Sequence, residues 1–145
     1  MLSNQEISLI RQFNRQYVLA LGVLNKKIFN TNLSWPEGRI LEEIGKQQPI
    51  KPIEIASFLH IDKSYTSRII KKLTKMELVI KLPSPSDARS VQLTLTNKGQ
   101  EVFYQIDQRS TTQIQDFISS LSTNEQQQFF NDIQQINHLL FERND

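Results

Sequence analysis

Residues 79–95 have the sequence VIKLPSPSDARSVQLTL, and this stretch decides the fold. Its first four residues favour a β-strand, and residues 91–95 alternate apolar and polar side chains as a half-buried strand does. The segment between them is rich in turn-forming residues and too long for a tight hairpin. We therefore expect a two-stranded ribbon with an extended loop, which we call the wing.

The segment before the wing predicts two short helices. Pro52 begins the first, and Asp62 caps the second after a tight turn at His60 and Ile61. The inward side of the second helix is expected to contain Thr66, either Ile69 or Ile70, Leu73 and Met76. This pattern predicts a helix-turn-helix, although many αα-hairpins share it, and the wing that follows makes it a winged helix.

The charge is distributed unevenly along the chain. Residues 63–98 carry a net charge of +6, whereas residues 1–62 carry +1 and residues 99–145 carry −5, which together give the overall +2. A basic block between neutral and acidic segments is typical of a surface that binds a polyanion. A solvated helix face is the alternative, and the position of the block on a helix-turn-helix and a wing favours DNA.

The part of the chain before the helix-turn-helix predicts two helices. A capping box at Ser3 and Glu6 starts a long amphipathic helix whose apolar face extends to Ile28, and the polar run at 30–32 ends it. A second, shorter helix starts at Ser34, with Pro36 in its first turn.

Two further helical segments follow the wing. Thr96 caps the first of them, in which a polar stretch at 107–113 separates two apolar groups. One helix over 96–121 and two helices with a break both fit this pattern. Ser122 and Glu125 form a capping box for the last helix.

The long helices at the two ends have apolar stripes that need a partner. A second copy related by two-fold symmetry would bury both stripes, so we expect a homodimer. Packing of the two helices within one chain is the alternative.

Several motifs together carry a family resemblance. They are IAxxLxIDxSxxSRxIxxL at 55–73, LVxK at 78–81, DAR at 87–89 and LTxxG at 95–99. These motifs, and their spacing, resemble the MarR family of bacterial transcription regulators. The motifs FNRxY at 13–17 and SxxExRIL at 34–41 are similar to MarR modules that are fused to acetyltransferases in other proteins, and we expect a stand-alone module here.

The resemblance implies a mainly α fold with a small β-wing. It implies a single domain over residues 1–145, with a winged-helix DNA-binding region at 34–98 and dimerisation helices at 1–33 and 99–145. Three positions depart from the family pattern: His60 and Glu77 stand where the family has glycine, and Lys81 replaces arginine. The two replaced glycines predict either a shifted backbone or a loss of about 1 kcal/mol each.

The expected DNA contacts lie on the second helix of the helix-turn-helix and on the wing. Base edges in the major groove are reached from the first turns of such a helix, which carry Lys63, Ser64, Tyr65, Thr66, Ser67 and Arg68. Phosphates are assigned to Lys71, Lys72 and Lys75, and also to Ser84 and Ser86. In the wing we expect Arg89 in the minor groove, held in place by Asp87 as the family aspartate would hold it.

The expected function is a ligand-responsive repressor that binds a pseudo-palindromic operator in double-stranded DNA as a homodimer. The alternatives are a winged-helix module for protein–protein contact and a non-specific DNA-binding protein. Phe13, Tyr17 and Trp35 are candidates for lining the pocket of a small aromatic or lipophilic effector, since MarR pockets form near these helices, although ordinary core aromatics are the alternative.

Composition excludes several other classes. The chain has no cysteine, so disulfides, thiolate metal sites and thiol switches are excluded. His60 and His138 lack neighbouring ligands at metal spacing, so we expect no metal, no cofactor and no enzyme. The longest apolar stretch, 18–24, is too short to span a membrane, and the N-terminus lacks a secretory signal, so we expect a cytoplasmic protein.

Overall fold

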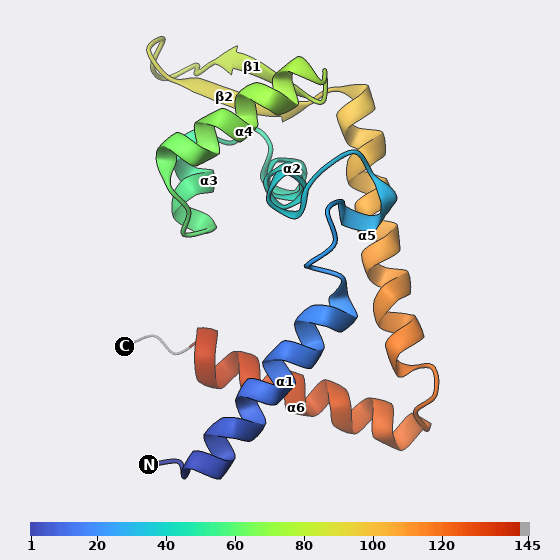
Figure 1. The fold of residues 1–145 in the computed structure, drawn as a ribbon. Helices are drawn as coiled ribbons and strands as arrows, with labels where there is room; N and C mark the ends of the chain where they lie inside the picture. The colour runs from blue at the N-terminus through green and yellow to red at the C-terminus, as the bar shows by residue number, and fades with distance from the viewer. Residues whose placement is uncertain (143–145) are drawn as a thin grey trace. The chain divides into compact units, whose positions relative to one another are not determined.

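The computed structural model describes residues 1–142, and Figure 1 labels its elements. In chain order they are α1 (Asn4–Leu21), the 3₁₀-helix η1 (Ile28–Asn30), α2 (Trp35–Gln47), α3 (Pro52–Phe58), α4 (Lys63–Lys75), β1 (Val79–Pro83), β2 (Val91–Leu95), α5 (Asn97–Ile118) and α6 (Thr123–Phe141). The chain divides into two compact units, Met1–Arg109 and Ser110–Asp145. The predicted mainly α fold with a small wing is confirmed.

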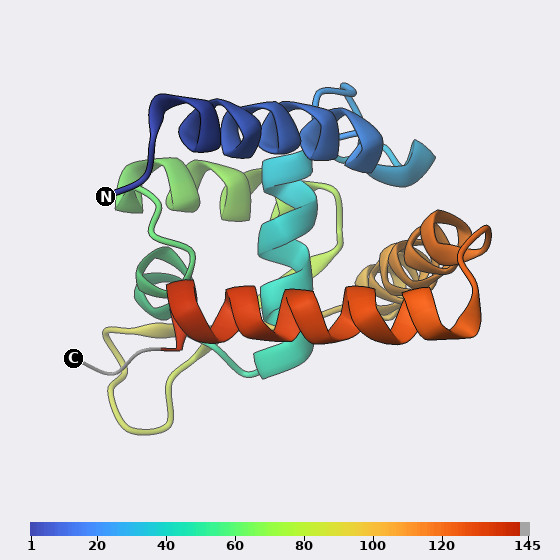
Figure 2. The same cartoon turned by 90° about the horizontal axis from the view of Figure 1, so that it is seen from below.

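The wing is an antiparallel pair of strands. Val79 lies opposite Leu95, and Pro83 lies opposite Val91. The loop between the strands extends away from the helices of this unit (Figures 1 and 2). At the other side of β2, Leu93 is buried and exchanges two backbone hydrogen bonds with Ile50, of 2.8 and 3.2 Å, which ties the ribbon to the segment before α3.

One apolar core holds the helix-turn-helix and the wing together. Helix α4 packs against α2, α3 and β1, and α2 also packs against β2. The core side chains that are fully buried in these elements include Ile40, Leu41, Ile44, Ile55, Leu73 and Leu93. The sequence left open whether Ile69 or Ile70 faces inward, and both are buried. The opposite face of α4 is thereby held toward solvent on a rigid base.

The first helix is shorter than the sequence predicted. It ends at Leu21, because Gly22 adopts the left-handed conformation with φ of 74° and its backbone N–H bonds to the last carbonyls of the helix. The expectation that this helix extends to Ile28 is therefore wrong. Instead, Ile28 starts the short η1 and inserts into the core with 1% exposure.

Both positions at which the sequence lacks the family glycine keep a glycine-like backbone. His60 has φ of 53° and Glu77 has φ of 60°. Of the two outcomes that we expected there, the structure has the strained one, which costs on the order of 1 kcal/mol per residue. Beside Glu77, the Thr96 hydroxyl donates to the Glu77 carbonyl at 2.6 Å and accepts the Gly99 N–H at 2.9 Å, which begins α5.

The helical segments after the wing are α5 and α6. The residues of α5 form one continuous helix to Ile118, which settles the alternative that the sequence left open. Helix α6 begins with the predicted capping box of Ser122 and Glu125. Neither α1 nor α6 contains a buried residue. Within residues 1–142, no helix has both the length and the apolar character that crossing a bilayer requires.

Candidate nucleic-acid interface

The first turns of α4 present a polar and basic face. The Asp62 side chain accepts the Tyr65 N–H at 2.9 Å and so fixes the beginning of the helix. Because every third or fourth residue is buried in the core, the residues between them point outward. The exposed side chains of these turns are Lys63, Ser64, Tyr65, Ser67 and Arg68.

Tyr65 and Arg68 interact with each other on this face. The guanidinium carbon of Arg68 lies 5.7 Å from the centroid of the Tyr65 ring. A cation–π contact of this kind contributes about 0.5–1 kcal/mol at an exposed site. The contact therefore limits the orientations of a long side chain that the sequence placed at the DNA.

Thr66 does not belong to this exposed face. It is 1% exposed, and its hydroxyl donates to the Asp62 carbonyl at 2.8 Å. The expectation that Thr66 contacts DNA is therefore corrected, because the residue packs in the core and positions the helix. Burial of Thr66 agrees with the helical spacing of the inward-facing residues, to which Thr66 belongs.

The lysines further along α4 differ in their surroundings. Lys71 and Lys75 are exposed. Lys72 Nζ lies 2.8 Å from Oε2 and 3.2 Å from Oε1 of Glu37, which is buried at the start of α2. Lys72 thus already binds an anion within the chain.

The Glu37 side chain caps the start of α2 and also binds helix α4. Besides binding Lys72, its carboxylate accepts the Ser34 N–H at 3.0 Å in a capping box. Burial raises the pKa of Glu37, but the hydrogen bonds from Lys72 and Ser34 act in the opposite direction and outweigh it, so the pKa is lowered. The sequence identified the cap, but the pairing with α4 gave no local signal.

The wing tip is organised by Asp87. Its carboxylate accepts the backbone N–H of Arg89 at 2.9 Å, and its carbonyl accepts the backbone N–H of Ser90 at 3.1 Å. Asp87 thus shapes the turn from which the exposed Arg89 side chain projects. Ser84 is 4% exposed, so its expected phosphate contact is corrected, whereas Ser86, within hydrogen-bond distance of it at 3.1 Å, is exposed.

A mainly apolar pocket of about 610 Å³ lies beside α4, between it and the beginning of α2. Its lining comprises Val23, Trp35, Pro36, Arg39, Leu59, Ile61 and Tyr65. Trp35, one of the three candidates for an effector pocket, is among these lining residues. Phe13 and Tyr17 instead stack on each other along α1, with ring centroids 5.3 Å apart, and are not among the residues that line this pocket.

The indole nitrogen of Trp35 is a buried donor that has no partner in the part of the chain that the structure describes. Arg39, in the same lining, carries the only formal charge there. The sequence did not indicate that Arg39 or the apolar residues of the helix-turn-helix turn line a pocket, because the lining comes from separate segments that meet only in the folded chain.

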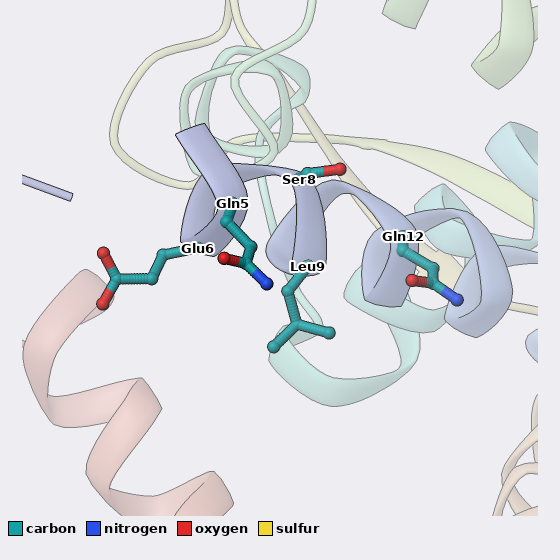
Figure 3. Close-up of a pocket in the computed structure, with 5 residues that line it drawn as sticks. All are labelled: Gln5, Glu6, Ser8, Leu9 and Gln12. Carbon is teal, nitrogen blue, oxygen red and sulfur yellow. The ribbon is translucent and has the colours of Figure 1, made fainter. Parts of the chain in front are cut away.

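A second hollow, of about 430 Å³, lies along α1. Figure 3 shows its lining side chains, Gln5, Glu6, Ser8, Leu9 and Gln12, all on that one helix. Glu6 is engaged in the capping box with Ser3, which lowers its pKa through the hydrogen bonds from Ser3. In residues 1–142, no three His, Asp or Glu side chains cluster as metal ligands.

A helix-turn-helix with an exposed basic face beside a wing defines a winged-helix DNA-binding protein. The MarR family model matches residues 33–91, and the chain belongs to the MarR family. It is a DNA-binding transcriptional regulator, and the family consists of regulators rather than enzymes. The predicted family is confirmed.

Relatives and solved structures agree with this assignment. The chain is 30% identical to an uncharacterized HTH-type transcriptional regulator of Staphylococcus aureus strain Mu50 over 97% of this chain and 95% of the relative. FabT of Streptococcus pneumoniae, solved in complex with DNA, has the same fold with a TM-score of 0.76 at 20% identity, over 97% of this chain and 99% of FabT. PcaV of Streptomyces coelicolor, solved with its natural ligand, has a TM-score of 0.63 at 21% identity, over 88% of each chain.

Proposed function

We propose that this protein is a ligand-responsive repressor that binds a pseudo-palindromic operator as a homodimer. The proposal rests on one observation: the core holds an exposed basic face, the first turns of α4, together with a wing whose tip presents the exposed Arg89. A helix of this kind enters the major groove, and an arginine on a flanking hairpin enters the adjacent minor groove.

The proposed contacts follow from exposure. Base edges are contacted by the five exposed residues of the first turns of α4, Lys63, Ser64, Tyr65, Ser67 and Arg68. Phosphates are contacted by Lys71, Lys75 and Ser86, which position the protein without sequence preference. Arg89 enters the minor groove.

The unburied terminal helices support a homodimer. In α1, Ile7, Ile10 and Phe13 follow one another at helical spacing and are 43%, 48% and 49% exposed. In α6, Ile136 and Leu140 are 43% and 68% exposed. Apolar surface of this extent is normally covered. Two-fold symmetry would let both helices bury their apolar sides against a second copy.

In the proposed dimer each chain forms a single domain, and each chain contributes one DNA-binding region. In this arrangement residues 34–98 form the DNA-binding region, and residues 1–33 and 99–145 form the dimerisation region. The two α4 helices, one from each chain and separated by about 34 Å, would contact successive major-groove faces of one duplex. Occupying a promoter in this way represses transcription.

The test is binding of labelled duplex DNA from upstream of the protein's own gene, followed by footprinting. We expect a protected, pseudo-palindromic site and an affinity that falls steeply with salt. Arg68→Ala is expected to weaken binding, while the control Lys26→Ala, which removes an exposed charge outside the winged helix, is not. No binding at low salt would favour a protein–protein module, and binding without a footprint would favour a non-specific DNA-binding protein.

The ligand-responsive part of the proposal is supported by the pocket beside α4 and by the related fold of PcaV, which was solved with a natural ligand. Footprinting in the presence of a panel of aromatic acids tests it. An acid that weakens protection of the operator supports ligand control, and a footprint that no acid changes contradicts it for this class of effector.

A further inference from the structure

Helix α5 contacts the winged helix at points well beyond its first turn. The Phe103 ring covers Gly45 of α2 so closely that a Cβ at this glycine would collide with the ring. Farther along α5, the half-buried Arg109 donates a hydrogen bond from its guanidinium to the Phe29 carbonyl of η1. The compact unit that contains the winged helix ends at this same Arg109.

The carbonyl that Arg109 binds belongs to a strained stretch of backbone. Phe29 has φ of 45° and Asn30 has φ of 59°, so two consecutive residues adopt the left-handed conformation that favours glycine. A bulky residue such as Phe29 is rare in this region. Strain of this kind persists only where the surrounding structure imposes it, and it concentrates at segments whose shape is used in function.

The strained segment is fixed to the core on both of its sides. Ile28 and Leu33 are each 1% exposed, and the Ile28 backbone N–H donates to the Leu33 carbonyl at 2.9 Å. Between them, the Thr31 hydroxyl donates to the Ile28 carbonyl at 2.7 Å and accepts the Leu33 N–H at 3.1 Å. The Phe29 carbonyl is therefore an acceptor at a fixed position on the winged-helix unit.

We propose that Arg109 is a positioning residue for operator recognition. Its bond to the Phe29 carbonyl, which we call the α5 clamp, fixes the direction in which α5 leaves the winged helix. That direction sets the spacing between operator half-sites that the proposed homodimer accepts. This inference rests on the proposed function, and it assigns the choice of spacing to one side chain and one strained loop.

The place of Arg109 along α5 explains why this one bond has such an effect. A helix rises by about 1.5 Å per residue, so Arg109 lies about 18 Å along the axis from Asn97, the first residue of α5. At that distance, each ångström of movement corresponds to a tilt of about 3°. Without the clamp, contacts nearer the beginning of α5, such as that of Phe103 with Gly45, hold the helix and allow a larger tilt. In a dimer, such a tilt in both chains changes the separation of the two α4 helices.

The clamp is tested first without DNA. The chain has no cysteine, so Ser57→Cys on α3 and Gln115→Cys on α5, both at exposed positions, supply unique sites for two nitroxide labels. Pulsed EPR measures the distance between the labels, with the labelled chain diluted into unlabelled protein so that only pairs within one chain contribute. We expect a narrow distance distribution with Arg109 and a broader one with Arg109→Met, which lacks the donor. A distribution of unchanged width in Arg109→Met would overturn the clamp.

Lys98→Met is the matched control. Lys98 also lies on α5, and its Nζ also donates to a backbone carbonyl, that of Met76, at 3.1 Å. It belongs to the first turn of the helix, where a lost contact changes the direction of the axis little. We expect this control to keep the narrow distribution, and equal broadening in both variants would overturn the assignment to Arg109.

The consequence for DNA is tested with the footprinted duplex and with duplexes that are one base pair longer or shorter between the half-sites. One base pair shifts a half-site by about 3.4 Å and rotates it by about 35°. The measured quantity is the ratio of the affinities for the native and the altered spacing, because a general loss of affinity cancels in this ratio. We expect Arg109→Met to lower the ratio by about 2-fold to 10-fold, the range that the loss of one hydrogen bond allows. Lys98→Met is expected to leave it unchanged.

The two measurements separate the possible failures. Broadened distances with a wild-type affinity ratio in Arg109→Met would overturn the role of the clamp in operator spacing. If the wild type binds no duplex or shows no preference for spacing, the proposed function itself fails, and the EPR distances then decide the clamp separately. If circular dichroism shows that Arg109→Met does not fold, Arg109→Gln is measured in its place against the same expectations.

Discussion

Glu37→Gln isolates one interaction that holds α4 to α2. Glutamine is also accepted at the third position of a capping box, so the substitution keeps the cap with Ser34. What it removes is the negative charge that binds Lys72. The variant is therefore expected to destabilise the fold through this one ion pair.

The magnitude follows from the exposure of the two partners. Lys72 Nζ lies 2.8 Å from Glu37 Oε2, and the side chains are 56% and 5% exposed. A fully exposed pair contributes about 0.2–1 kcal/mol, whereas breaking a fully buried pair costs about 3–5 kcal/mol. A pair with one buried and one exposed partner falls between these limits, at about 1–2 kcal/mol of unfolding free energy.

The assay is a double-mutant cycle with Lys72→Met, followed by urea unfolding at one protein concentration. The folded-state pKa of Glu37 is lower than the value in the unfolded chain. Its contribution is therefore fully present above the unfolded pKa and is lost as the pH falls through the folded value. We expect a coupling energy near neutral pH that shrinks in acid, as the pH falls through the lowered folded-state pKa of Glu37.

Two results would refute this reasoning. A coupling energy of zero near neutral pH would mean that the pair is not formed in solution. A coupling energy that persists unchanged in acid would mean that Lys72 interacts with Glu37 through something other than the carboxylate charge.

Three further predictions concern the wing, the two strained turns and the lysines of α4. Arg89→Ala should weaken duplex binding by about 1–3 kcal/mol without changing the oligomeric state, as checked by anisotropy and sedimentation, and an unchanged affinity would remove the wing from the interface. His60→Gly and Glu77→Gly should each raise the free energy of unfolding by about 0.5–1 kcal/mol, because both residues have positive φ, and a loss of stability in urea unfolding would contradict the strain. Lys71→Ala should reduce the salt slope of DNA binding by about one, and Lys72→Ala by less, since Lys72 has a partner within the chain; equal slopes would contradict this difference.

Much of the fold was predictable because its signals are local. The capping boxes at Ser3, Ser34 and Ser122 lie within four residues of sequence, and each one begins a helix in the structure. The wing was predictable from strand alternation and turn residues for the same reason. The end of the first helix was not predictable in this way. The apolar periodicity continues past Gly22 and favours a longer helix, whereas the single glycine is the residue that ends it.

The structure also supplies a physical reason for one motif residue. Gly99 lies in the LTxxG motif, and a Cβ at this position would collide with the carbonyl oxygen of Leu78. Leu78 also accepts the Thr96 backbone N–H at 3.1 Å, so the chain passes itself closely at the beginning of α5. From sequence, the motif was recognisable only through the family resemblance, and the close approach of two backbone segments explains why it contains a glycine.

The proposed interface was predictable only to the level of a basic face. In the sequence, Lys71, Lys72 and Lys75 are three equivalent cations on one helix. Their difference arises because Glu37, distant in the chain, is buried where α2 meets α4, and a buried carboxylate binds the nearest cation. Tyr65 is a second example, because it lines the same pocket as Trp35 and Pro36, which lie far away in the sequence at the start of α2. Exposure and partners, rather than charge alone, therefore decide which residues of a basic helix are free to bind DNA and which ones keep that helix in place.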